Sequence, residues 1–372
     1  MKTFKTLLSL SLVLTALTPA MAVHAHAARP TTSTTVSSPS ATANTTSSTS
    51  SNKSVSSTGE TNTQQPEVNK QFFDQQKSAV LRDLTGSEPV STAAADGTSA
   101  DQLQQADYTY MTVTGEVYSS KRGYLGAAKR DDDNAPDNRS SVTQFDPNNP
   151  IPVEQVNGGN TGAFERRQLG FEGFDSITSD ITLPTVSGLG PGEQPWVYYG
   201  FDAESGKAIE AGYSYQTGSH RWLPYIRSNG FYYGDSSVQK YDTNQVKNVK
   251  FYLAKTVSSD TYYNAYFVVD NTQVLIAPTK WTDSDSNSTS VKRVTSIAKK
   301  AFTGYDIVGS TMNQRYENVQ VSRFYEEQGY PWSQYREYTE NRNGRWYGTL
   351  DNMPSYVHRD WLSTSIYNGN NQ

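Results

Sequence analysis

An alternation of apolar and polar positions begins at Tyr108 and recurs over most of the chain that follows. Within 108–117 the side chains alternate with a period of two residues, which is the period of a half-buried strand. The later candidate strands are seven to thirteen residues long, rich in Tyr, Val, Phe and Thr, and bounded by turn-forming residues. We expect these strands at 171–183, 195–203, 207–216, 221–227, 247–257, 261–269, 272–278 and 314–326.

Short turns separate several of these segments. Asp270-Asn271 lies between the last two strands before residue 280, and Ser205-Gly206 lies between 203 and 207. Such dipeptides adopt the left-handed backbone conformations of tight hairpins. Many short strands without an alternating helix predict an all-β protein, a two-sheet concanavalin-like jelly-roll sandwich over 108–372.

Two segments have the spacing of a helix instead. Residues 67–86 carry apolar side chains on one face of a helix and end at Gly86, which predicts an amphipathic helix that docks on the main domain or binds a partner. Residues 289–300 place Val291, Val294 and Ile297 three apart, which predicts a second, short helix. The polar interval 87–107 is expected to be a linker.

The first 66 residues differ in composition from the rest. Lys2 and Lys5 precede a short apolar run, and Ala25-His26-Ala27 follows as a small-x-small site, so we expect a signal peptide over 1–27. In 31–60, 20 of 30 residues are Ser or Thr, which predicts a disordered linker over 28–66. We therefore expect a secreted or cell-surface protein with no transmembrane segment in the mature chain.

Composition removes several function classes. The formal net charge of −5 argues against a nucleic-acid partner, and no cysteine is available for a disulfide or a thiolate ligand. His220 and His358 are the only histidines after the expected cleavage site, and no zinc, dinucleotide or phosphate-loop motif occurs. We expect no metal and no cofactor. Two acidic clusters, 131–137 and 283–287, lack a complete calcium ligand set and are expected to be solvated loops.

A block between 195 and 280 resembles a known family. Its elements are Trp196-Val197, Gly200-Phe201-Asp202, Ile209-Glu210-Ala211-Gly212, Arg221-Trp222-Leu223-Pro224 and Gly234-Asp235. They resemble the pattern W-V-G-I-D, L-Q-x-G, E-W-x-P, G-D of the eqolisins, or glutamic peptidases. That resemblance implies a lectin-like β-sandwich with a concave sheet. The block is also similar in style to secreted proteins of the YrpD family.

Two positions depart from the eqolisin pattern. Glu210 occupies the position of the family's catalytic Gln, and Arg221 that of its catalytic Glu. An arginine stays protonated and cannot act as a general base. If the alignment holds, the two side chains face each other across neighbouring strands, and we expect a Glu210–Arg221 ion pair in place of catalytic residues.

The same block is unusually aromatic. Glu210, Gly212 and Ser214 share one strand face, and Tyr213 and Tyr215 share the other, so about half of the aromatic side chains should fill the core. A carboxylate is costly to bury in a core, so we expect the Glu210 side to be the concave, ligand-binding face. The candidate ligand-binding residues are Glu210, Arg221, Trp196, Tyr198, Trp222 and Tyr225.

Three functions remain open at this stage. The first is a non-catalytic module that binds a cell-envelope or extracellular polysaccharide. The second is a carboxylate-dependent enzyme on the same face, either a polysaccharide hydrolase or lyase or a peptidase. Its carboxyls would come from Glu172, Asp175, Asp202, Glu204 and Glu210. The third is a structural envelope or matrix protein. The distances between these carboxyls in the folded protein would distinguish the binding module from the enzyme.

Overall fold

A computed structural model describes residues 67–85, 99–130, 162–234, 240–299, 307–323, 329–335, 337–341, 350–351 and 362–366. The signal peptide and the Ser/Thr-rich linker predicted over 1–66 lie outside the described residues. So does the acidic cluster at 131–137, together with His358. Within the described part, no helix has the length and apolar character needed to cross a membrane.

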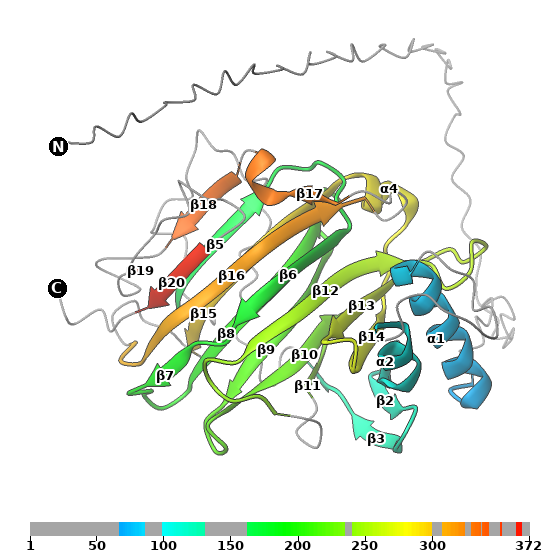
Figure 1. The fold of residues 1–372 in the computed structure, drawn as a ribbon, viewed down its shortest axis with the longest axis horizontal. Coiled ribbons are helices and arrows are strands. Elements are labelled where there is room, and N and C mark those ends of the chain that lie inside the picture. Colours follow the sequence, from blue (N-terminus) through cyan, green and yellow to red (C-terminus); the bar gives the residue numbers. More distant parts are fainter. Residues whose placement is uncertain are drawn as a thin grey trace, which may run out of the picture. The chain divides into compact units, whose positions relative to one another are not determined.

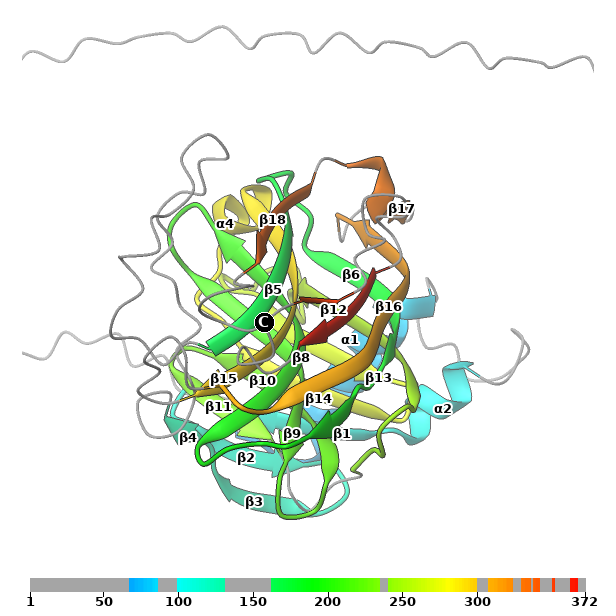
Figure 2. The ribbon, with the colours of Figure 1, turned by 90° about the vertical axis from the view of Figure 1, so that its left-hand side faces the viewer.

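The described strands form two sheets (Figures 1 and 2). The larger has the order β19–β20–β16–β6–β12–β13–β14–β1–β2–β3, and β7 and β17 also pair with β16. Its strands are β1 (Asp107–Met111), β2 (Glu116–Ser119), β3 (Gly123–Ala127), β6 (Ser176–Thr182), β7 (Thr185–Ser187), β12 (Val246–Ala254), β13 (Asn264–Val269), β14 (Gln273–Pro278), β16 (Ser310–Ser322), β17 (Tyr330–Pro331), β19 (Leu350–Asp351) and β20 (Leu362–Ile366). The short 3₁₀ helix η2 (Trp332–Gln334) follows β17.

The smaller sheet has the order β18–β5–β15–β8–β9–β10–β11–β4. Its strands are β4 (Lys129–Arg130), β5 (Gly162–Leu169), β8 (Glu193–Ala203), β9 (Ala208–Gln216), β10 (Arg221–Ser228), β11 (Phe231–Gly234), β15 (Thr289–Lys299) and β18 (Glu337–Asn341). Each described pair in this sheet is antiparallel, whereas β1 and β14 of the larger sheet run parallel.

A hydrophobic core joins the two sheets, so the fold is the β-sandwich that the alternation predicts. Val197, Tyr199 and Phe201 of β8 point into it, and the ring of Phe201 stacks on Phe251 of β12 with centroids 4.6 Å apart. Every second residue of the inner strands is thereby removed from water, and this burial is the main stabilising contribution to such a fold. Trp332, in the C-terminal segment, is fully buried in the same core.

Two helices cover the part of the larger sheet's other face that is formed by β1, β12, β13 and β14. The predicted helix is present as α1 (Lys70–Thr85), and α2 (Ser99–Gln105) occupies part of the interval predicted to be a linker. Phe72, Phe73, Val80 and Leu81 of α1 pack on a layer of sheet side chains that includes Tyr266 of β13. The Tyr266 hydroxyl donates to Gln76 Oε1 at 2.9 Å. Figure 1 shows both helices beside β13 and β14.

The predicted helix at 289–300 is wrong, because this segment is strand β15. Val291 and Ile297 point into the core, and Val294 points to the opposite face. The strand lies between β5 and β8, and Thr289–Ala298 are buried on both of its faces, so apolar residues occur on both sides of it. Apolar residues spaced three apart are compatible with a strand that is buried on both faces as well as with a helix. The sheet pairing outweighs the local spacing.

Two further differences concern the segment after Tyr108. The single strand expected over 108–117 is a hairpin of β1 and β2, which turns at Gly115 with φ +86°. The sequence also missed β5, which begins at Gly162 and pairs with β15. The two predicted hairpin turns are present: Asp270 and Asn271 have φ of 48° and 55°, and Gly206 has φ of 81°.

Candidate functional site

The face of the eight-stranded sheet that points away from the core carries the candidate residues; we call it the outer face. Tyr213 and Tyr215 of β9 lie in the core, and Glu210 and Ser214 lie on the opposite side of the strand. The alternation expected in β9 is therefore confirmed. The reason for expecting Glu210 on an open face does not hold, because this residue is only 6% exposed and is stabilised by cationic neighbours instead. Trp196, Tyr198 and Tyr225 lie on the outer face too, where they form a cluster with Val294 and Ala298.

A network of four charged side chains occupies the middle of the outer face. Lys292 Nζ of β15 lies 2.9 Å from Asp202 Oδ1 of β8 and 3.2 Å from Glu210 Oε1 of β9. Arg227 Nη1 of β10 lies 3.3 Å from Glu210 Oε2. Each of these four residues is less than a tenth exposed. Gln168 of β5 extends the network by donating from Nε2 to Asp202 Oδ2 at 3.3 Å.

These pairings decide the protonation of the site. Burial acts to raise the pKa of Glu210, but the charges of Lys292 and Arg227 and their hydrogen bonds outweigh it, so this pKa is below its ordinary value. Burial likewise acts to lower the pKa of Lys292, and the charges of Asp202 and Glu210 outweigh it, so the pKa of the ammonium is raised. Glu210 is therefore a carboxylate and Lys292 an ammonium at neutral pH.

Gly200 makes the network sterically possible. It lies on β8 between Lys292 of β15 and Glu210 of β9, in one row of directly opposed residues. A Cβ atom at this position would lie 2.3 Å from Lys292 Cε. The Lys292 side chain therefore crosses β8 over the bare backbone of Gly200 and reaches a carboxylate two strands away.

Aromatic side chains adjoin the charged network. The rings of Tyr225 and Tyr232 are edge-on to Trp196, with centroids 4.9 Å and 5.5 Å from it. Tyr232 also shares a hydrogen bond of 2.9 Å with Ser214 Oγ. Tyr232 and Phe164 are partly buried members of the cluster, and Trp196, Tyr198 and Tyr225 are buried. The outer face thus combines fixed charges with aromatic surface.

The structure corrects two of the candidate residues. Arg221 does not pair with Glu210: it lies opposite Gln216 and forms an exposed ion pair with Asp242, with Nε 2.9 Å from Oδ1. Glu210 lies opposite Arg227, six positions further along β10, or about 20 Å. Trp222 is on the core side of β10, where it is fully buried and its Nε1 donates to the Pro184 carbonyl at 2.9 Å.

The register of this hairpin was available in the sequence. The turn Thr217–His220 joins Gln216 to Arg221, so counting outward from those two residues places Arg227 opposite Glu210. His220 is an exposed residue of that turn. Lys292 was missed because its segment was predicted to be a helix. No local signal shows that its side chain meets Asp202 and Glu210.

The other candidate carboxyls are not part of the network. Glu172 and Glu204 are exposed, and Asp175 is buried and accepts a hydrogen bond from Ser286 Oγ at 2.6 Å. Only Asp202 and Glu210, of the five candidates for a carboxylate-dependent enzyme, contact a common group.

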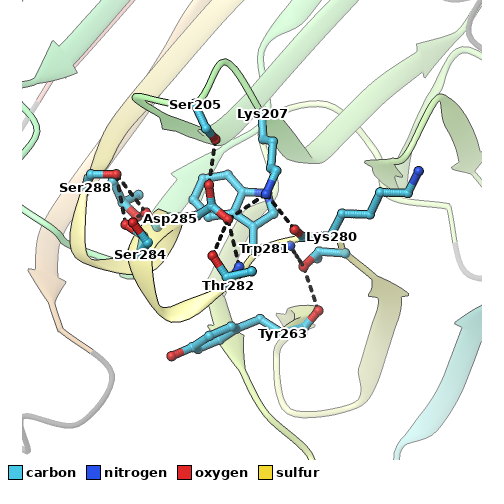
Figure 3. Close-up of polar contacts among 11 residues, drawn as sticks. Ser205, Lys207, Tyr263, Lys280, Trp281, Thr282, Ser284, Asp285 and Ser288 are labelled. Atoms are coloured by element: carbon cyan, nitrogen blue, oxygen red, sulfur yellow. Dashed lines mark hydrogen bonds and ion pairs between the residues drawn. The ribbon is translucent and has the colours of Figure 1, made fainter. Parts of the chain in front are cut away.

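The acidic cluster at 283–287 is occupied by protein groups, as Figure 3 shows around Asp285. Asp285 accepts hydrogen bonds from Ser205 Oγ at 2.6 Å, Lys207 Nζ at 2.7 Å and Thr282 Oγ1 at 2.8 Å. These contacts fasten the β8–β9 turn to the short helix α4 (Asp283–Asn287). Asp283 pairs with Lys255. Among the described residues, no group of three or more His, Asp or Glu side chains is arranged to hold a metal ion.

No protein-family model matches this chain, and no curated protein sequence is significantly similar to it. The structure resembles the eqolisin sandwich at low identity and also resembles alginate lyases. Scytalido-glutamic peptidase with a transition-state analogue inhibitor has 10% identity and a TM-score of 0.37, over 55% of this chain and 98% of that one. The peptidase SCP-B, an eqolisin, has 9% identity and a TM-score of 0.35, over 56% and 98%. The alginate lyase Aly36B has 16% identity and a TM-score of 0.27, over 44% and 70%.

Proposed function

We propose that this chain is an exported, non-catalytic protein that binds a polysaccharide through the outer face of its eight-stranded sheet. The main observation behind this proposal is that Glu210 is a buried carboxylate bonded to both Lys292 and Arg227. Two cations hold it as an anion, so it has no proton to donate, and its lowered pKa makes it a weak base. A buried carboxylate neutralised in this way is unsuited to proton transfer, which favours binding over catalysis on this face.

The aromatic cluster supports a sugar ligand. Aromatic rings stack on the C–H faces of sugar rings, and the partly buried Phe164 and Tyr232 offer such surface beside the charges. The Tyr232 and Ser214 hydroxyls add polar groups at the same place. The N-terminal signal peptide and Ser/Thr-rich linker predicted from the sequence accord with an extracellular polysaccharide as the ligand.

The alternative is a glycoside hydrolase that acts from the same face, and one distance favours it. Because Lys292 Nζ lies 2.9 Å from Asp202 Oδ1 and 3.2 Å from Glu210 Oε1, these two oxygens are at most about 6.1 Å apart, which permits the spacing of about 5–5.5 Å found in retaining glycosidases and is shorter than that of inverting ones. A glycosidase, however, needs one of its carboxyls protonated. The ammonium between these two groups opposes that protonation.

Affinity electrophoresis of the full chain in gels that contain β-glucan, xylan or alginate tests the proposal. We expect retardation by at least one polymer, and its loss in Tyr232→Ala. The matched control is Tyr262→Ala, which removes an exposed tyrosine of the β12–β13 loop and should migrate like the wild type.

Two outcomes would reject the proposal. The first is a protein that is retarded by none of the polymers, or whose retardation Tyr232→Ala leaves unchanged. The second is the release of reducing ends or of unsaturated sugars from a polymer that binds. The second outcome would establish the enzyme instead, and Glu210→Gln would then be expected to abolish the release.

A further inference from the structure

Two hydrogen-bonding groups on the outer face lack partners. Trp196 of β8 and Ser296 of β15 are directly opposed across these neighbouring strands, and both point to the outer face. Trp196 Nε1 and Ser296 Oγ are both buried, and neither has a hydrogen-bond partner. The residues themselves are 7% and 1% exposed. Buried polar groups are usually paired, and although other buried side-chain atoms of the described residues also lack partners, these two belong to residues that are directly opposed on the outer face.

A second tryptophan in the same sheet shows the usual arrangement. Trp222 points into the core, and its Nε1 donates to the Pro184 carbonyl at 2.9 Å. The N–H group of this core tryptophan therefore has a hydrogen-bond partner within the fold. Trp196 is edge-on to Tyr225 and Tyr232, and these contacts position its ring without satisfying its N–H group.

We infer that Trp196 and Ser296 form a hydrogen-bonding subsite for acceptor oxygens of the bound saccharide, an inference that rests on the proposed function. An indole N–H can only donate and a serine hydroxyl can donate as well, so a ligand that satisfies both groups must offer acceptor atoms. A sugar hydroxyl and a uronate carboxylate both supply such an oxygen. A group that can only donate, such as an ammonium, does not fit.

The surroundings of the subsite suit a sugar ring. Phe164 lies opposite Ser296 on β5, and Tyr232 lies against Trp196 on the other side. Both are partly buried members of the aromatic cluster. Both rings offer surface that can pack on the C–H face of a sugar bound here.

The test compares two Trp→Phe substitutions in the full chain. Trp196→Phe keeps an aromatic ring but removes an unpaired donor and part of a buried indole, so we expect a smaller fall in melting temperature than in Trp222→Phe and a threefold to tenfold weaker affinity, roughly the contribution of one hydrogen bond. Trp222→Phe removes a paired donor in the core. It should lower the melting temperature and leave the affinity unchanged. Ser296→Ala should behave like Trp196→Phe.

Neutral β-glucan and alginate serve as separate probes in affinity electrophoresis. Weakened retardation by β-glucan identifies a hydroxyl as the acceptor, and weakened retardation by alginate alone identifies a carboxylate. Wild-type retardation in both Trp196→Phe and Ser296→Ala would overturn the subsite while the proposed function stands. A melting temperature that falls in Trp196→Phe as far as in Trp222→Phe would overturn it too. A wild-type chain that neither polymer retards would overturn the proposed function, and the subsite with it.

Discussion

Glu210 and Arg227 lie directly opposite each other on β9 and β10, with 3.3 Å between Glu210 Oε2 and Arg227 Nη1. Both side chains are about nine-tenths buried, and Glu210 is bonded at its other oxygen to Lys292. The arrangement differs from the one expected from sequence, in which Glu210 faces Arg221. It also means that the hairpin register sets the charge state of the candidate site.

We expect the buried pair to matter far more for stability than the exposed one. Arg227→Ala leaves Glu210 buried with one counter-ion removed, and should lower the free energy of unfolding by about 3 kcal/mol. Arg221→Ala breaks a pair whose partners are 50% and 58% exposed, and should lower it by about 0–1 kcal/mol. Urea denaturation at pH 7 measures both. Equal losses in the two variants would contradict the assignment of Arg227 as the partner of Glu210.

Gly200→Ala should disrupt the network without removing any charge. The added methyl group would meet Lys292 Cε and push the ammonium away from Asp202 and Glu210. The loss of these buried pairings should cost about 2–4 kcal/mol, again measured by urea denaturation. The control is Gly218→Ala in the β9–β10 turn, where a Cβ meets nothing within 4 Å and the expected change is within about 0.5 kcal/mol. If Gly200→Ala lowers the free energy of unfolding no more than Gly218→Ala does, the position of the Lys292 ammonium does not depend on the bare backbone of Gly200.

The docking of α1 should weaken as the pH rises. Burial raises the pKa of Asp83 from 3.8 to about 6, against the lowering effect of Arg82 and Lys250. Because the folded state holds this proton more tightly than the unfolded state, the contribution is fully present below about pH 4 and is lost as the pH rises through about 6. The shift corresponds to about 3 kcal/mol.

Asp83→Asn should remove this loss, so the variant should exceed the wild type in stability at pH 7 and match it near pH 4. Urea denaturation across this range gives the difference between the two proteins, in which the titration of all other carboxyls cancels. Asp74→Asn alters an exposed residue of the same helix and should show no such trend. A difference between Asp83→Asn and the wild type that is constant with pH would exclude the titration of Asp83.

We expect no acid peptidase activity from the wild-type chain. Glu210 is neutralised by two cations, and Arg221 lies about 20 Å away along the hairpin. The double change Glu210→Gln with Arg221→Glu restores the eqolisin residue types, but at positions too far apart to act on one water molecule. Digestion of denatured casein at pH 3–5 should therefore stay at the level of a buffer blank in both proteins. Cleavage by the wild type that disappears in Glu210→Gln would reverse this conclusion.

Chelation should leave the described fold intact. Asp285 is bonded to Ser205, Lys207 and Thr282, and Asp283 to Lys255, so each carboxylate already has protein partners. We expect the same melting temperature in EDTA as in buffer, measured by differential scanning calorimetry. A drop of more than a few degrees that calcium restores would show that a cation stabilises the protein.

The sequence by itself determined the class of fold and the two sides of its central strands. Strict alternation in β9 separates Glu210 and Ser214 from Tyr213 and Tyr215, because a strand sends successive side chains to opposite faces. The hairpin turns were predictable for a similar local reason: Asp270 and Asn271 tolerate the positive φ that a tight turn needs.

Only the tertiary structure decided β15 and the site. The segment 289–300 satisfies a helix or a doubly buried strand equally well, and pairing with both β5 and β8 selects the strand. That choice brings Lys292 beside Gly200, where the absence of a side chain lets the ammonium reach Glu210. Contacts of this kind depend on which strands become neighbours. Neighbours distant in sequence are fixed by the burial of the whole sheet, which no local pattern encodes.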